Sequence, residues 1–175
     1  MAKPKISDLK KYFATLDEAA LREELFKLFN RLPQVQEFYA QELMSESERK
    51  IVLEAYKKKI YSQFWTASGN PRNNISNTDL RRLIADFENV SLFPHELVDL
   101  ILYRVEIATE YADMFGGMSD SNYNAAQNAF EKAVELMAEH KLGGHFKARC
   151  EKLFRYENTG SGYIDGLEYI YRKYF

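Results

Sequence analysis

One stretch of this chain constrains its fold more than any other: FPHELVDLILYRVEIATEYADMF, which runs from Phe93 to Phe115. Pro94 suits the first turn of a helix, where its missing N–H group costs nothing, and Gly116 suits the residue after a helix end. When successive residues are placed about 100° apart around a helix axis, apolar and aromatic side chains cover most of the circumference. A helix of this kind has neighbours on several sides. The sequence therefore predicts a central buried helix over about residues 94–115.

The rest of the chain has the pattern of an α protein. Its 4 prolines and 8 glycines fall between segments of helical periodicity, and no alternation typical of strands is present. Asp17 suits an N-cap, and Ser45-x-x-Glu48 has the form of a capping box. We therefore predict an all-α fold, a single domain over residues 1–175 in which roughly eight helices pack as helical hairpins around the central helix.

Apolar residues that recur at helical spacing predict which helix faces point inward. In the first quarter of the chain they predict a short first helix that includes residues 9–13, and then two helices with buried inner faces, separated by Pro33. The residues expected to lie inward there are Leu21, Leu25, Phe26, Leu28, Phe29, Leu32, Val35, Phe38, Tyr39 and Leu43. Further along, Asn77 or Thr78 is expected to cap the helix that precedes the central one.

Composition and charge set limits on partners and location. Apolar residues make up 46% of the chain and charged residues 29%, and the net charge of −2 gives no general attraction to nucleic acid. Charges along the central stretch argue against a membrane span. Cys150 is the single cysteine, so no internal disulfide can form, and the first residues lack the apolar core of a signal peptide. We expect a cytoplasmic protein with no cofactor, no catalytic thiol, and neither a membrane nor nucleic acid as partner.

A narrow acidic stripe runs along the central helix, with a histidine at its head. It consists of His95, Asp99, Glu106, Glu110 and Asp113. One interpretation is the single hydrated face of a mostly buried helix. The other is a carboxylate metal site, with His95 and Asp99 as a pair one helical turn apart. Helical di-metal proteins use Glu-x-x-His pairs, which none of the three histidines here forms.

Arg104 lies on the opposite, apolar side of the same helix. A buried arginine needs a compensating negative charge. We therefore expect an ion pair between Arg104 and a carboxylate that the sequence does not identify.

The segment Glu157–Glu168, ENTGSGYIDGLE, has the length and part of the pattern of a calcium-binding loop. Such a loop supplies oxygen atoms from its first, third, fifth, seventh, ninth and twelfth positions and needs glycine at the sixth. Gly162 occupies the sixth position. The ligand positions hold Glu157, Thr159, Ser161, the Tyr163 carbonyl, Asp165 and Glu168. Glutamate at the first position and threonine at the third weaken the match, and the alternative is a glycine turn that joins two helices.

Basic and aromatic residues gather between positions 57 and 82, the combination with which proteins hold single-stranded nucleic acid. The residues that suit an anion-binding site there are Lys58, Arg72, Arg81 and Arg82, beside the N-terminus of the following helix. Helix phase spreads the lysines at 57–59 over most of a turn, so they cannot form one flat patch. The alternative is a hydrated helix face and loop.

Several phrases together carry a resemblance. They are Asp99-Leu-Ile-Leu-Tyr-Arg-Val-Glu106, Asn122-Tyr-Asn124, Phe146-x-x-Arg149, and Gly160-Ser-Gly-Tyr-Ile-Asp165 before Leu167 and a tyrosine-rich tail. On these the chain resembles an uncharacterised bacterial family known only as a domain of unknown function. The resemblance implies an all-helical cytoplasmic protein and carries no catalytic residues across. It also suggests that the final glycine turn is a packing feature.

Motifs of enzymatic chemistry are missing from the sequence, which has no nucleophile elbow, phosphate loop or dinucleotide fingerprint. We assign no catalytic residue. The leading hypothesis is a non-enzymatic helical interaction or scaffold protein whose partner is another protein or a second copy of itself. The alternatives are a calcium-binding module through the loop 157–168 and a metal-dependent enzyme on the stripe of His95, Asp99 and Glu106.

Overall fold

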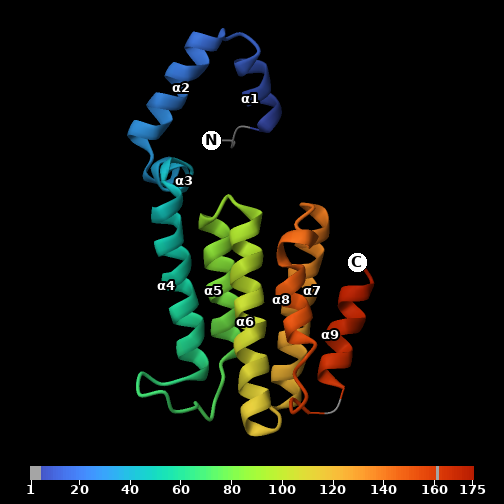
Figure 1. The fold of residues 1–175 in the computed structure, drawn as a ribbon. Helices are drawn as coiled ribbons and strands as arrows, with labels where there is room; N and C mark the ends of the chain where they lie inside the picture. Colours follow the sequence, from blue (N-terminus) through green and yellow to red (C-terminus); the bar gives the residue numbers. More distant parts are fainter. Residues whose placement is uncertain (1–4, 161) are drawn as a thin grey trace. The chain divides into compact units, whose positions relative to one another are not determined.

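The computed structural model of the chain describes residues 5–160 and 162–175 (Figure 1). All named elements in these ranges are helices, which confirms the predicted all-α class. They are α1 (Ile6–Phe13), α2 (Glu18–Arg31), α3 (Pro33–Leu43), α4 (Glu46–Phe64), α5 (Asn77–Val90), α6 (Pro94–Phe115), α7 (Asp120–Glu139), α8 (Gly143–Leu153) and α9 (Tyr163–Arg172).

The chain divides into two compact units, Met1–Met44 and Ser45–Phe175. We refer to them as the N-terminal unit and the C-terminal unit and describe each by itself. The first holds α1 to α3 and the second α4 to α9. The prediction that residues 1–175 form one domain stays a prediction.

The N-terminal unit is helical but has no fully buried side chain. Asp17 caps α2 as predicted, because its Oδ1 accepts a hydrogen bond from the backbone N–H of Ala20 at 2.8 Å. None of the described residues from 5 to 44 is buried, however. The prediction of buried inner faces is therefore wrong here: Phe26 is 61% exposed and Leu43 is 73% exposed. Three short helices offer one another too little surface to enclose a core.

The C-terminal unit is built around α6, as the sequence predicted. α6 packs against α4, α5 and α7, and α7 in turn packs against α8 and α9 (Figure 1). Pro94 lies in the first turn of α6, and Gly116 ends the helix in the left-handed conformation with φ of 69°. Leucine, isoleucine, valine and alanine side chains on most of its circumference are buried. No helix in the described part of the chain is both long and apolar enough to span a membrane.

The caps of the C-terminal unit agree with the sequence in one case and differ in another. The capping box of Ser45 and Glu48 is present, with the backbone N–H of Ser45 donating to Glu48 Oε2 at 2.8 Å. At α5 the N-cap is Ser76, whose Oγ accepts from the backbone N–H of Asp79 at 3.2 Å. Asn77 does not cap, because its side-chain amide donates to Asn122 Oδ1 at 2.7 Å and so joins the starts of α5 and α7.

Candidate functional site

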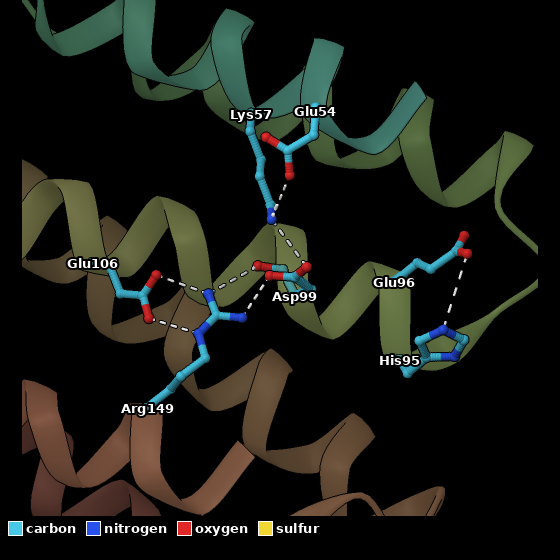
Figure 2. A network of polar contacts seen from close by, with 7 residues as sticks. All are labelled: Glu54, Lys57, His95, Glu96, Asp99, Glu106 and Arg149. Carbon is cyan, nitrogen blue, oxygen red and sulfur yellow. Dashed lines mark hydrogen bonds and ion pairs between the residues drawn. The ribbon is translucent and has the colours of Figure 1, made fainter. Parts of the chain in front are cut away.

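The acidic stripe of α6 faces α8, and one arginine of α8 lies between two of its carboxylates. Asp99 and Glu106 are seven residues apart, which is about two helical turns, so their side chains lie on one face. Arg149 donates from Nε to Glu106 Oε1 at 2.7 Å and from Nη2 to Glu106 Oε2 at 2.8 Å, and its Nη1 donates to Asp99 Oδ1 (Figure 2). The planar guanidinium thus makes a forked pair with one carboxylate and a further bond to the other.

A second cation reaches Asp99 from α4. Lys57 Nζ lies 3.0 Å from Asp99 Oδ2 and 3.1 Å from Glu54 Oε1 (Figure 2). Asp99 therefore has one oxygen on a lysine of α4 and the other on an arginine of α8. This network, formed by Glu54, Lys57, Asp99, Glu106 and Arg149, joins three helices, and we call it the Arg149 network.

Burial and neighbouring charges shift the pKa values of the side chains on this face in opposite directions. Burial alone would lower the pKa of Arg149, but hydrogen bonds and charge from Glu106 and Asp99 outweigh it and raise that pKa overall. Glu110, further along the stripe, differs. Burial raises the pKa of its carboxyl, the charge of Lys152 opposes this, and Glu106 adds to it. The stripe is thus largely neutralised by cations where it is covered by α8.

His95, Asp99 and Glu106 do not come together as one site. His95 Nε2 lies 4.0 Å from Glu96 Oε1, and Arg149 lies between Asp99 and Glu106 (Figure 2). Within the described residues no group of three histidine, cysteine or acidic side chains is placed to hold a metal ion. A cavity of about 360 Å³ touches His95 and Asp99, and its lining includes neither Glu106, Glu110 nor Asp113. The geometry gives the metal hypothesis no support, and it stays a prediction.

The predicted calcium loop is shorter in the structure than the pattern requires. α9 already begins at Tyr163, so Asp165 and Glu168 are helix residues, and Glu168 pairs with Arg172 at 2.6 Å. Glu157 is exposed and Thr159 is buried, while Ser161 lies outside the described residues. Tyr163 is buried and its hydroxyl lies 3.2 Å from Thr109 Oγ1. This arrangement does not favour a calcium site, and calcium binding stays a prediction.

Packing explains why position 160 of this turn is a glycine. Tyr123 of α7 donates its hydroxyl to the backbone carbonyl of Thr159 and accepts from the backbone N–H of Met118 at 3.0 Å. Gly160 has φ of 92°, and a Cβ there would lie 2.3 Å from the Tyr123 hydroxyl. A side chain at this position would therefore be both strained and in collision. Asp113, the last stripe residue, also holds the turn, because its Oδ1 accepts from the backbone N–H of Asn158 at 3.1 Å.

The residues predicted to bind an anion lie in different places. Lys58 is exposed on α4, Arg72 donates to the Ser62 carbonyl at 2.6 Å, and Arg82 pairs with Asp79 at 2.8 Å. Two aromatic residues of the same region, Phe64 and Trp65, are buried and so cannot stack on bases. Arg81 lines a cavity, and a second arginine lies in the lining of the same cavity.

This second arginine is Arg104, and the expectation of an ion pair is wrong for it. Arg104 is 4% exposed. No hydrogen bond or ion pair joins its side chain to another described residue, and its guanidinium nitrogens keep a small solvent contact. Its pKa is lowered to about 10, chiefly by burial and also by the positive charge of Arg81, while Tyr163 opposes these effects. The cavity beside it measures about 670 Å³. The sequence predicted a carboxylate partner for the positive charge of Arg104. In the structure this side chain lines the cavity instead.

Cys150 on α8 is a packing residue of the core. Its side chain is buried, and burial raises the pKa of the thiol to about 12, although the nearby Arg149 charge opposes this. Because the thiolate is the nucleophile, a thiol with such a pKa is inert near neutral pH.

Sequence reasoning missed Arg149 and the polar face of α7. Phe146 and Cys150 are buried residues of α8. Arg149 precedes Cys150 and lies three residues after Phe146, so the sequence indicates that Arg149 lies beside the buried face of this helix. On α7, small and polar residues repeat at helical spacing and line the Arg104 cavity. They are Ser121, Asn124, Ala125, Asn128 and Ala129. A helix face of small side chains leaves space next to a neighbouring helix, so this pattern in the sequence could have predicted the cavity.

Comparison with known proteins gives a family and no activity. A model described as "Family of unknown function (DUF6155)" matches residues 2–159. No curated protein and no solved structure matches this chain. The matched range includes the Arg149 network and Arg104, and it ends before α9 begins.

Proposed function

We propose that this chain, which belongs to the Family of unknown function (DUF6155), is a non-enzymatic helical interaction protein that pairs with a second copy of itself through residues 6–43. One observation carries the proposal: no described side chain of the N-terminal unit is buried, although its helices are rich in large apolar residues. A short segment that exposes this many large apolar side chains is typical of an interaction site.

The apolar residues come from all three helices of the N-terminal unit. Those that are exposed are Ile6, Leu9, Tyr12, Phe13, Leu25, Phe26, Leu28, Leu32, Phe38 and Leu43. A unit of about 40 residues needs a disulfide, a metal or association to become stable. Cysteine is absent from residues 1–44, which excludes a disulfide within this unit. Within the described residues no group of histidine, cysteine or acidic side chains is placed to hold a metal ion, so association with a partner surface is the route we propose.

Charge favours a second copy over a nucleic acid or an anionic membrane as the occupant. Residues 5–44 contain 6 lysines and arginines and 7 aspartates and glutamates. Several of these charges already pair within α2, such as Arg22 with Glu18 at 2.6 Å and Lys27 with Glu24 at 2.8 Å. A balanced surface meets its own copy without net repulsion, whereas phosphate-rich partners need an excess of cations.

Sedimentation velocity of the full chain across micromolar concentrations tests the proposal. We expect a dimer for the wild type and a monomer for Phe26→Glu and Phe38→Glu, because each places a charge in the apolar contact. Tyr169→Glu is the matched control: Tyr169 is an exposed aromatic residue of α9, outside the N-terminal unit, and the variant should remain a dimer. A wild-type monomer at all concentrations would overturn the proposal.

The location of the protein and the two alternative functions are also proposals. A bacterial, cytoplasmic location rests on the sequence resemblance and on the single cysteine, and cell fractionation tests it.

Calcium binding at 157–168 is tested by calorimetric titration of metal-stripped protein, with Glu168→Gln as the comparison. A metal-dependent enzyme on the stripe is tested by metal analysis of the purified protein.

A further inference from the structure

The cavity beside Arg104 lies on the side of α6 away from the Arg149 network. α5 and α7 each pack against α6 but make few contacts with each other, and the cavity lies where they separate. Its lining residues are spaced three or four apart on both outer helices, so each helix contributes one face. Ile101 and Arg104 of α6 complete the lining. A volume of about 670 Å³ lies within the range of roughly 300–1,000 Å³ that small-molecule sites occupy.

The charges around the cavity are predominantly positive. Arg81, Arg104 and Lys132 line it together with a single carboxylate, that of Glu88. Lys132 Nζ lies 2.5 Å from Glu88 Oε2, so these two neutralise each other at the rim. Arg81 and Arg104 remain as two positive charges that no carboxylate of the described residues pairs with. An additional anion at this place would stabilise both.

Arg104 is the decisive residue because it is buried. A cation removed from water is costly unless a negative charge and hydrogen bonds compensate for it. Arg81 is exposed, and water can solvate it. Arg104 lines the cavity, and it also borders a small gap beside Asn77 and Asn122, where α5 and α7 begin. Helix N-termini carry partial positive charge, which adds to the attraction for an anion at this end.

The rest of the lining indicates what kind of anion fits. Apolar side chains form much of the wall, namely Ile84, Ala85, Ile101, Ala125 and Ala129. Asn124 and Asn128 of α7 add amide groups at the rim. A free phosphate would leave the apolar wall uncovered. One carboxylate on an apolar body satisfies Arg104 and covers the wall.

We propose that the cavity between α5, α6 and α7 binds a small organic monocarboxylate, whose carboxylate pairs with Arg104 and whose apolar body lies against Ile84, Ile101 and the alanines of α7. This site is separate from the dimer contact proposed for residues 6–43. Binding there does not depend on self-association.

Isothermal titration calorimetry with hexanoate tests the site on the full chain. We expect saturable binding to the wild type, no binding of hexanol, and at least ~10-fold weaker binding of hexanoate to Arg104→Met, since a charge-assisted hydrogen bond is lost. Arg155→Gln is the matched control, because Arg155 is an exposed arginine outside the cavity lining, and its variant should bind as the wild type does.

A second variant keeps the test decisive if Arg104→Met folds poorly. Ala125→Phe leaves Arg104 in place and fills the cavity from α7, so it should abolish hexanoate binding and leave the helical circular dichroism spectrum unchanged. Absence of hexanoate binding to the wild type, or equal binding to Ala125→Phe and the wild type, would overturn the proposal. Tighter binding of inorganic phosphate than of hexanoate would overturn the assignment to a carboxylate.

Discussion

An arginine lies on each of two sides of α6, and the two arginines differ in whether carboxylates compensate their charge. On one side Arg149 of α8 contacts Glu106 through a forked pair and also contacts Asp99, so its charge is compensated twice. On the other side Arg104, which belongs to α6 itself, is more deeply buried and has no carboxylate partner among the described residues. The first cation has a role in holding helices together. The second makes no such contact with a described residue, and it faces a cavity.

This difference separates structural charges from charges that are available to a ligand. An ion pair with satisfied hydrogen bonds fixes the position of the elements that carry it, and losing one member leaves the other uncompensated. A buried cation without a partner lowers the stability of the folded state until something binds. The same substitution at the two arginines should therefore change stability in opposite directions.

The largest effect is expected from Arg149→Met. It leaves Glu106 without its forked partner and Asp99 with Lys57 alone, and we expect the free energy of unfolding to fall by about 3 kcal/mol. Urea unfolding followed by the fluorescence of Trp65, which is buried in the C-terminal unit, measures this change. Arg155→Met is the control and should stay within about 0.5 kcal/mol of the wild type. An unchanged midpoint for Arg149→Met would mean that the Arg149 network is not structural.

Arg104→Met should have the opposite sign. It removes a buried cation that lacks a partner and keeps an apolar side chain of similar length, so we expect the free energy of unfolding to rise by about 1 to 2 kcal/mol in buffer without organic anions. The same fluorescence assay measures it. A clear loss of stability in Arg104→Met would show that Arg104 has a compensating partner in the folded protein, and would remove the contrast between the two arginines.

Lys57→Met tests how much of the Arg149 network depends on its second cation. Asp99 retains Arg149 in this variant, so we expect a loss of only about 1 kcal/mol. Lys59→Met, an exposed lysine of the same helix, serves as the comparison. If Lys57→Met costs as much stability as Arg149→Met, then α4 contributes as much to the network as α8 does.

The smallest effect concerns Glu110, which lies on the stripe outside the Arg149 network. Glu110 is exposed, but partial desolvation of its carboxyl raises the pKa above the ordinary value of 4.5, so the folded protein disfavours the ionised form. Glu110→Gln should therefore be slightly more stable than the wild type at pH 7. The advantage should fade as the pH falls through the raised pKa towards 4.5, where the wild-type carboxyl becomes protonated. Urea midpoints of both proteins at several pH values measure it, and an advantage that persists at low pH would contradict this cause.

Features that depend on local pattern were predictable from the sequence. The buried helix from Pro94 to Phe115, the capping box of Ser45 and Glu48, and the N-cap at Asp17 all follow from spacing and residue type within a few positions. Each of them is decided by neighbours along the chain. The structure agrees with the sequence at these points for that reason.

Features that depend on distant partners were not predictable. Arg149 is 43 residues from Glu106 and 50 from Asp99, and no local pattern encodes that pairing. Periodicity identified the apolar faces near Phe26 and Phe38, but it cannot tell whether another element covers them. For Arg104, the rule that a buried cation needs compensation identified the requirement, but the sequence could not show that a cavity takes the place of a carboxylate.

We infer that Arg104 is open to an anion and that Arg149 is not, and the arginine Nε–Hε signals in an NMR titration distinguish the two. Hexanoate is added to one labelled sample, with the signals assigned through Arg104→Met and Arg149→Lys. We expect the Arg104 signal to move saturably while the Arg149 signal stays in place. A stationary Arg104 signal, or equal movement of both, would contradict it.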